Sequence, residues 1–174
     1  ARFPAMRKAL EPVLDLMAVA TLADMMPIAD ENRILVRAGL EMLNLSPHTG
    51  LRALMQEQGL LGKRIASRDV GWNIGPVINA SGRMGEPDKA VELLLEPDAE
   101  RRKTLAAEVV GMNRRRKKAG DDAWKQVLPK ADANKLEYDE RLIMIHAPNI
   151  HRGVTGIIAG RLSRHYNLPA AVIT

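Results

Sequence analysis

Residues 142–174, LIMIHAPNIHRGVTGIIAGRLSRHYNLPAAVIT, decide the fold class of this 174-residue chain. The stretch begins with a compact apolar segment at 142–146 that is typical of a strand, continues with a helix at 153–166 and ends with a second apolar strand at 170–174. Parallel strands need a long crossover connection, and a helix of this length supplies one. The sequence therefore predicts a strand–helix–strand unit and an α/β fold.

The segments before this unit are predicted to be mostly helical. The apolar stretch 11–24 fits either a buried helix or a buried strand, and its Ala and Met content favours the helix. Apolar residues at three- and four-residue spacing predict amphipathic helices at 30–45 and 49–60. A shorter helix is expected at 86–96, where a proline near the start is compatible with the first turn. The predicted class is a helix-rich α/β protein.

Two segments carry helix-breaking residues. Gly and Pro interrupt 66–85, which predicts a short helix followed by an ordered loop. A long helical segment is predicted from 98 to 128, where Pro129 is expected to end it. The polar residues 130–140 then read as a linker.

Composition excludes several classes of function. The absence of Cys rules out disulfides, thiolate zinc sites and cysteine nucleophiles. No apolar run is long enough to span a membrane, and the first residues do not resemble a signal peptide, so a cytoplasmic protein is expected.

Positive charge is concentrated in the second part of the chain. Basic and acidic residues number 11 and 13 up to Asp98, but 15 and 8 from Ala99 onward. The second part is therefore the one expected to meet a polyanion. With two Trp, two Tyr and one Phe, the chain has little with which to stack on bases, so contact with a nucleic acid would be mainly electrostatic.

Two positions are candidates for metal or anion binding from the pattern alone. Asp24 closes an apolar stretch, where a carboxylate serves either as a helix-terminal residue or as a ligand for a hard cation. His151 stands just before Gly153 and a predicted helix start, where backbone N–H groups can bind an anion. An ordinary loop histidine is the alternative, and no complete active site emerges.

Arginine and lysine side chains offer a second kind of site. Arg83 provides a guanidinium fork for a phosphate, or else pairs with Glu86 or Asp88. The run RRRKK places five cations within little more than one helical turn, which suits a phosphate backbone. Its members are Arg114, Arg115, Arg116, Lys117 and Lys118. The alternative is a solvated helix face partly paired with Glu108, Asp121 and Asp122.

Three stretches, in order, resemble the RecJ single-strand-specific exonucleases of the DHH phosphoesterase superfamily. The segments DLMAVATLADMMPI (15–28) and ENRILVRAGLEML (31–43) resemble the fourth conserved motif of that family and its next helix. GPVINASGRMGEPDKAVELLL (75–95) is similar to the family's GPRINAAGR-type segment. HRGVTGIIAGRLSRHYNLPAAVIT (151–174) resembles the segment that opens the second domain, DHHA1.

The resemblance implies a domain organisation. Residues 1–98 would form the C-terminal part of a DHH domain, 99–130 a connecting helix and 131–174 the opening β-α-β of a DHHA1 domain. The DHH triplet and the DxD motif of the family are absent from the chain. We therefore expect an internal fragment that is inactive alone.

The implied activity of the parent protein is 5′→3′ degradation of single-stranded DNA, in DNA repair and recombination. Two Mn²⁺ or Mg²⁺ ions would activate water in such an enzyme. The alternatives are a DHH-family oligoribonuclease or cyclic-dinucleotide phosphodiesterase, or a non-catalytic nucleic-acid-binding module. The expected partner is single-stranded DNA, with no membrane.

The family's functional residues carry over to six positions. Asp24 matches a metal ligand, and Asp15 matches a recurrent acid near it. The residues matching the substrate-phosphate loop and the cleft side of the second domain are Asn79, Arg83, His151 and Gly153. The chain departs from the family where Val77 replaces a frequent Arg, Ile150 a frequent Trp and Gly160 a frequent Ser.

Overall fold

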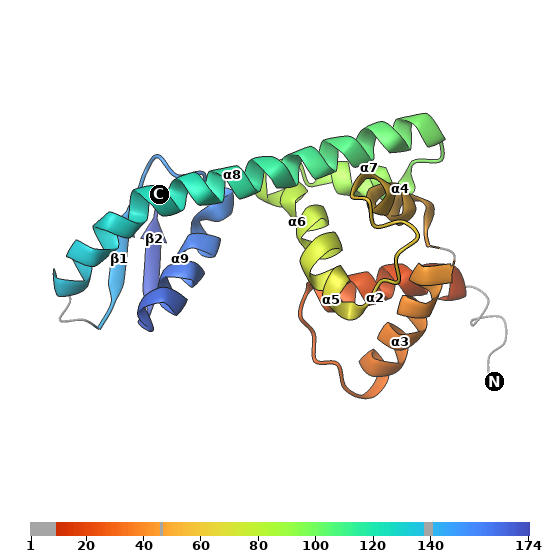
Figure 1. Ribbon diagram of the computed structural model, residues 1–174, viewed down its shortest axis with the longest axis horizontal. Helices are drawn as coiled ribbons and strands as arrows, with labels where there is room; N and C mark the ends of the chain where they lie inside the picture. The colour runs from red at the N-terminus through yellow and green to blue at the C-terminus, as the bar shows by residue number, and fades with distance from the viewer. Residues whose placement is uncertain (1–9, 46, 138–140) are drawn as a thin grey trace.

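The computed structural model describes residues 10–45, 47–137 and 141–174 and arranges them as two lobes along one long helix (Figure 1). That helix, α8 (Ala99–Glu137), contributes to two separate hydrophobic cores. Its first half packs on the helical lobe, and its second half packs on a small α/β lobe. Within the described ranges, no helix combines the length and the apolar character needed to cross a bilayer.

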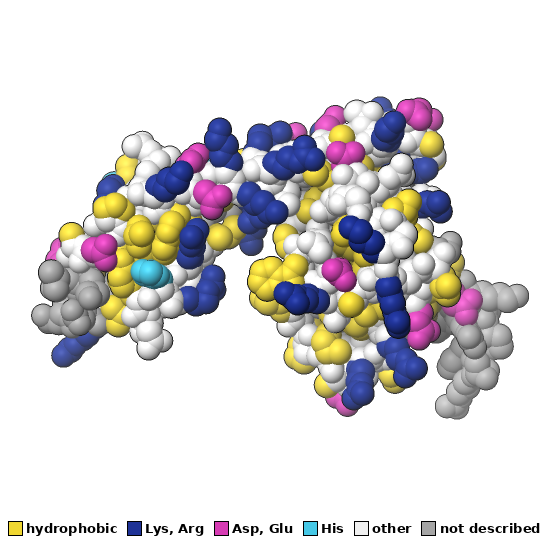
Figure 2. Space-filling view, viewed as in Figure 1, with side chains coloured by type: hydrophobic (Ala, Val, Ile, Leu, Met, Phe, Trp, Pro, Cys, Tyr) yellow, Lys and Arg dark blue, Asp and Glu magenta, His cyan; other side chains and the backbone are white. Residues whose placement is uncertain are grey.

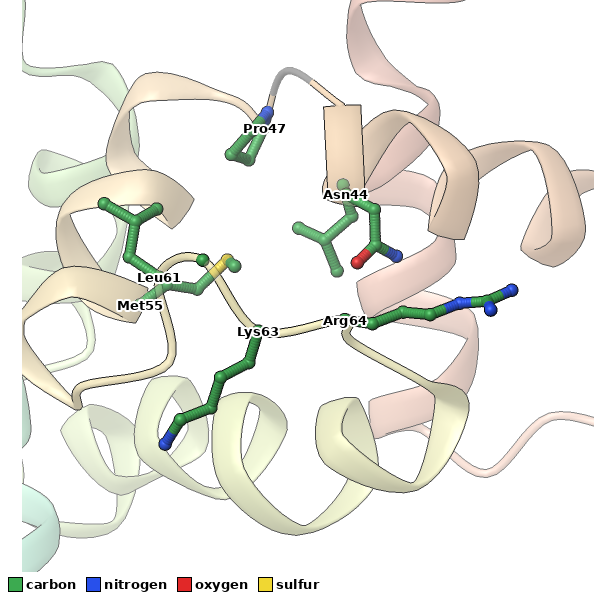
Figure 3. Close-up of a pocket in the computed structure, with 8 residues that line it drawn as sticks. Asn44, Pro47, Met55, Leu61, Lys63 and Arg64 are labelled. Carbon is green, nitrogen blue, oxygen red and sulfur yellow. The ribbon is translucent and has the colours of Figure 1, made fainter.

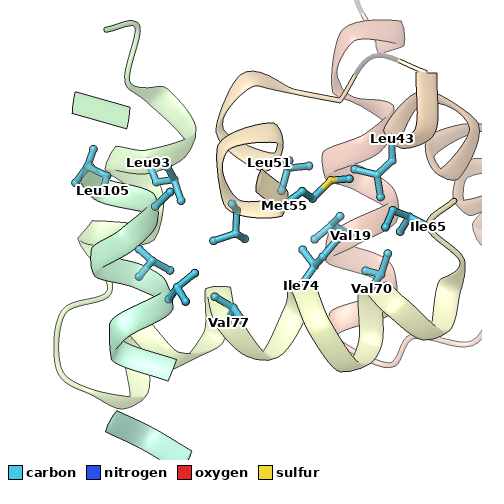
Figure 4. Packing of buried hydrophobic residues seen from close by; sticks show 14 residues of the cluster. Val19, Leu43, Leu51, Met55, Ile65, Val70, Ile74, Val77, Leu93 and Leu105 are labelled. Carbon is cyan, nitrogen blue, oxygen red and sulfur yellow. The ribbon is translucent and has the colours of Figure 1, made fainter. Parts of the chain in front are cut away.

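The first lobe consists of short helices around one apolar core. Its elements are η1 (Glu11–Val13), α2 (Leu14–Ala23), α3 (Asp30–Leu45), α4 (Thr49–Glu57), α5 (Ser67–Asp69), η2 (Val70–Ile74), α6 (Gly75–Arg83) and α7 (Asp88–Leu95). The helix predictions for 30–45, 49–60 and 86–96 are confirmed, and 11–24 is helical rather than extended. Figure 4 shows Val19, Leu51 and Ile74 packing together although they come from α2, α4 and η2.

The second lobe is the predicted strand–helix–strand unit. Strand β1 (Ile143–His146) pairs in parallel with β2 (Ala170–Ile173), and α9 (Arg152–Tyr166) forms the crossover. Helix α9 and α8 enclose an apolar core that includes the fully buried Val127, Val154 and Leu162. The α/β prediction is therefore confirmed.

The prediction of an ordered loop within 66–85 is wrong. Helix α5, the π-helical turn η2 and helix α6 follow one another without a break. Val70, Ile74 and Val77 are buried at helical spacing, so burial in the core holds the segment helical despite its glycines. Pro76 lies in the first turn of α6, where it interrupts the ordinary hydrogen-bond pattern of an α-helix. The Gly75 N–H donates to the carbonyl of Val70, five residues back, as in a π-helix.

The prediction that α8 ends at Pro129 is also wrong. The helix continues to Glu137, so the linker expected at 130–140 is helical over 130–137, and 138–140 lie outside the described residues. Val127 and Ala131, on either side of the proline, are fully buried in the second core. This tertiary burial outweighs the intrinsic cost of a proline within a helix, which is about 3 kcal/mol.

Candidate nucleic-acid interface

Helix α6 carries two predicted site residues on its exposed face. Asn79 and Arg83 are four residues apart, so they lie one above the other on the helix surface. The opposite face is held in the core by Val77, Ala80 and the buried Ser81. Helix α6 runs from the first lobe to the junction of the lobes, where it contacts α9 (Figure 1).

Asn79 shares a pocket with Asp24. The pocket has a volume of about 390 Å³ and is otherwise lined by apolar side chains such as Leu16, Leu51 and Ile78. Asp24 is exposed at the C-terminal end of α2, and within the described part of the chain its carboxylate makes no hydrogen bond or ion pair. The helix dipole disfavours an anion at this end of a helix, so a nearby cation would stabilise this carboxylate.

The described residues do not contain a complete metal site. No group of three or more His, Cys, Asp or Glu residues lies close enough together in the described ranges to hold an ion. Asp15 has a structural role instead, because its buried carboxylate accepts the N–H of Leu16 at 2.7 Å and the N–H of His48 at 2.5 Å. Asp24 fits a metal only as one carboxylate among ligands supplied from elsewhere.

The structure brings Arg83, His151 and Gly153 together where α6 ends and α9 begins. The Nη1 atom of Arg83 donates to the Gly153 carbonyl at 3.4 Å. The backbones approach so closely that a Cβ at Gly153 would overlap the carbonyl oxygen of Arg83. The Nδ1 atom of His151 accepts the Gly153 N–H at 3.1 Å and so caps α9.

Arg83 does not form the ion pair with Glu86 or Asp88 that was the structural alternative from the sequence. Glu86 pairs instead with Arg115, at 3.7 Å, and among the described residues Arg83 has no acidic partner. The guanidinium is exposed. It is therefore free to offer its remaining N–H groups to an anion.

The five cations of the 114–118 run have different surroundings. Arg114 pairs with Glu57 at 4.0 Å, and Lys117 and Lys118 have no partner within the described ranges. Two of the three acids predicted to neutralise the run pair with other residues, since Glu108 pairs with Lys89 and Asp121 with Arg161. Figure 2 shows Lys and Arg side chains gathered along α8 and above the hollow between the two lobes.

Arg116 is a member of the run on which the charge of Arg83 acts. Burial, and then the positive charge of Arg83, lower the pKa of its guanidinium. The Oδ1 atom of Asn113 accepts from both Nε and Nη2 of Arg116. Asn113 was not among the residues predicted from the sequence. The available signal was an amide three residues before an arginine in a helix, a spacing that places both side chains on one face.

A second pocket has a volume of about 370 Å³ (Figure 3). It lies between the end of α3 and the segment after α4, and none of the predicted site residues lines it. Asn44 stabilises its wall by accepting the Ile65 N–H at 2.7 Å and donating to the Ile65 carbonyl at 2.9 Å. The side chains of Lys63 and Arg64 extend in different directions, so they form no common anion site.

Comparison with curated proteins identifies relatives with one activity. The chain is 38% identical over 148 residues to the single-stranded-DNA-specific exonuclease RecJ of Thermus thermophilus, covering 85% of this chain and 21% of the relative. It is 32% identical over 163 residues to RecJ of Bacillus subtilis, covering 94% and 20%. For RecJ of Escherichia coli the identity is 30% over 164 residues, covering 92% and 28%. No protein-family model matches the chain.

Solved structures of RecJ proteins also match this chain. RecJ of Thermus thermophilus in complex with Mg²⁺ matches with a TM-score of 0.82 at 35% identity, covering 93% of this chain and 25% of that one. An exonuclease RecJ bound to manganese matches with a TM-score of 0.81 at 35% identity, covering 94% and 40%. The chain thus spans 20–28% of the length of these curated relatives.

Proposed function

We propose that this chain, which is homologous to the RecJ single-stranded-DNA-specific exonucleases over most of its length, is a section of such an exonuclease. The parent protein would degrade single-stranded DNA from its 5′ end in DNA repair and recombination, and would act in the cytoplasm. The role of this section would be to hold the strand between two lobes.

The observation that supports this proposal is the junction of α6 and α9. There Arg83 contacts Gly153, and His151 caps the helix that starts beside them. The exposed guanidinium and the N-terminal end of a helix both favour a phosphate group. Arg115 of the cationic run pairs with Glu86, which follows α6, and the charge of Arg83 acts on Arg116. A strand bound at Arg83 would therefore also meet positive charge along its backbone.

A divalent metal is part of the proposal for the parent protein. Relatives were crystallised with Mg²⁺ and Mn²⁺. Asp24 would contribute one carboxylate, and the other ligands would come from outside this chain. When bound, such ions lower the pKa of a water molecule and stabilise the charge of the phosphodiester transition state. Asn79, in the pocket with Asp24, would orient a substrate phosphate by hydrogen bonding.

We further propose the domain boundaries. Residues 1–98 would belong to a DHH domain, 99–130 to the connecting helix and 131–174 to the start of a DHHA1 domain. The two hydrophobic cores support a division within α8. The last residue of this helix that is buried in the first core is Val110, and the first that is buried in the second core is Ala123.

Two other activities are less well supported. An oligoribonuclease or cyclic-dinucleotide phosphodiesterase would act on short substrates, whereas the relatives found are exonucleases specific for single-stranded DNA. A non-catalytic binding module would need only the cationic surface. Digestion assays with long single-stranded DNA, short RNA and cyclic dinucleotides separate these three cases.

The proposed function is tested with the intact parent exonuclease and with this chain alone. We expect the parent protein to digest long single-stranded DNA with Mn²⁺, Asp24→Ala in the parent to reduce the rate at least a hundredfold, and Lys103→Ala, an exposed control, to leave it unchanged. This chain alone should release no nucleotides. Reproducible Mn²⁺-dependent digestion by the purified chain contradicts the claim that its site is incomplete.

A further inference from the structure

We propose that Arg116 is a second phosphate-binding arginine beside Arg83, and that Asn113 is the residue that positions it. This inference rests on the proposed function, since it states which cation of the 114–118 run contacts the bound strand in a fixed geometry. It also gives a role to Asn113, which was not among the residues predicted from the sequence.

The first observation is how Arg116 is held. The Oδ1 atom of Asn113 accepts from Nε at 3.1 Å and from Nη2 at 2.9 Å. Asn113 is only 6% exposed, although an amide in the middle of a helix usually faces water. Two hydrogen bonds to one edge fix the plane of a guanidinium, and the Nη1 hydrogens on the other end stay free to donate. Arg116 is therefore oriented before any ligand binds.

The second observation is the charge around Arg116. Its hydrogen-bond partner is a neutral amide, and none of the salt bridges in the described residues includes Arg116. The charges of both Arg83 and Asp121 act on Arg116, and the repulsion from Arg83 is the larger of the two. Asp121 itself pairs with Arg161 at 3.8 Å. Two guanidinium groups that repel one another, neither of them in an ion pair with a described residue, form a site that a phosphate stabilises.

The third observation concerns Arg83, the other half of the pair. Its backbone is in close contact with Gly153, and its side chain reaches the Gly153 carbonyl. Both arginines are thus anchored at the junction of the lobes, one through α9 and the other through Asn113. A phosphate between them would be held by two planar forks rather than by mobile charges.

The other members of the run lack this arrangement. Arg114 and Arg115 each have an acidic partner, Glu57 and Glu86 respectively. Lys117 and Lys118 are exposed, and no described residue fixes their side chains. These four would attract a strand through their summed positive charge, whereas Arg116 would make a contact that depends on geometry.

The substitution N113D distinguishes two roles for Asn113: positioning Arg116 to bind a phosphate, or only stabilising the fold. N113D keeps the oxygen that holds Arg116, so the fold and the Arg116 contact are retained. The added carboxylate neutralises the local charge and competes with a phosphate. We expect N113D to bind a labelled single-stranded oligonucleotide about tenfold more weakly, with a melting temperature close to that of the parent chain. The control Gln126→Glu makes the same change of charge at an exposed position of α8 and should have little effect.

Two further variants test the arginine itself. R116A should weaken binding about tenfold and lower the slope of log affinity against log salt by about one, as expected for one lost phosphate contact. R116K keeps the charge but not the fork, and it should also lose affinity several-fold. K103A, on the same helix but in the first lobe, should bind like the parent chain.

Each outcome decides the proposal. Weaker binding by N113D, R116A and R116K in folded protein, with unchanged controls, supports it. If these three variants bind like the parent chain while R83A binds weakly, Arg116 is not a strand contact, and the proposed function still stands. If the unaltered chain binds no single strand at low salt, both the inference and the proposed role in holding the strand are wrong.

Discussion

Gly153 lies at a close backbone contact between the two lobes, and its lack of a side chain permits the contact. A Cβ at this position would overlap the Arg83 carbonyl, which is backbone and cannot move aside by a rotamer change. We expect Gly153→Ala to destabilise the chain by about 1–3 kcal/mol, as other overpacked sites do. Thermal unfolding followed by circular dichroism measures this.

Gly156 is the matched control for Gly153. It lies in the same helix, and no atom of another part of the chain is near an added Cβ. Gly156→Ala should therefore stabilise the chain slightly, by up to about 1 kcal/mol, since Ala is the better helix former. Equal melting temperatures for the two variants contradict the close packing of α9 on α6.

Asp15 and Asp24 have opposite roles, although both stand in the segment that resembles a metal-binding motif. Asp15→Ala removes the acceptor for two backbone N–H groups in a buried place and should cost about 1–3 kcal/mol of stability. Asp24→Ala removes an exposed carboxylate without a partner in the described residues, so it should change stability by less than about 0.5 kcal/mol. Denaturant unfolding of both variants checks this, and a larger loss for Asp24→Ala contradicts the assignment.

At the scale of elements, periodicity predicted the helices and the two strands well, and failed where tertiary packing overrides local preference. Pro129 is a strong local signal to end a helix, but Val127 and Ala131 are buried on both sides of it. The glycines and Pro76 in 66–85 similarly indicate a loop, but the core holds that segment as helix. Burial against distant parts of the chain is not visible in a short sequence window.

The candidate site was predictable only in part, for a related reason. The resemblance singled out Arg83, His151 and Gly153, and the structure brings these three together. Their contact joins residues that are 70 positions apart, so no local pattern predicts it. Asn113 was missed because its significance depends on burial and on which neighbour its oxygen contacts.

Tyr166 joins α9 to the last turns of α8 and gives that contact a pH dependence. Its hydroxyl donates to Asp132 at 2.6 Å, and burial together with this bond raises the pKa of the phenol to about 12. A free tyrosine titrates near 10. The stabilisation from this bond is therefore present in full below about pH 10 and is lost as the pH rises to about 12.

Ultraviolet absorbance of the phenolate measures this titration, with Tyr166→Phe identifying the signal. Replacement of Asp132 by Asn should bring the pKa of Tyr166 back toward 10, because the carboxylate favours the neutral phenol. A Tyr166 titration at the ordinary value in the unaltered chain contradicts the observed link between α8 and α9.

At the scale of the whole molecule, we propose that two lobes on a common helix hold a single strand at their junction. The cations that face the hollow come from both lobes and from α8 (Figure 2). With few aromatic residues in the chain, electrostatics would dominate the affinity, which should therefore fall steeply with added salt.

The most direct test is fluorescence anisotropy of this chain with a labelled single-stranded oligonucleotide, with and without a 5′-phosphate, over a salt series. We expect tighter binding of the phosphorylated strand, a steep loss of affinity with salt, and loss of the preference in R83A but not in Arg37→Ala, an exposed control on α3. Equal binding of the two strands, or no binding at low salt, contradicts recognition of a strand end at the junction of α6 and α9.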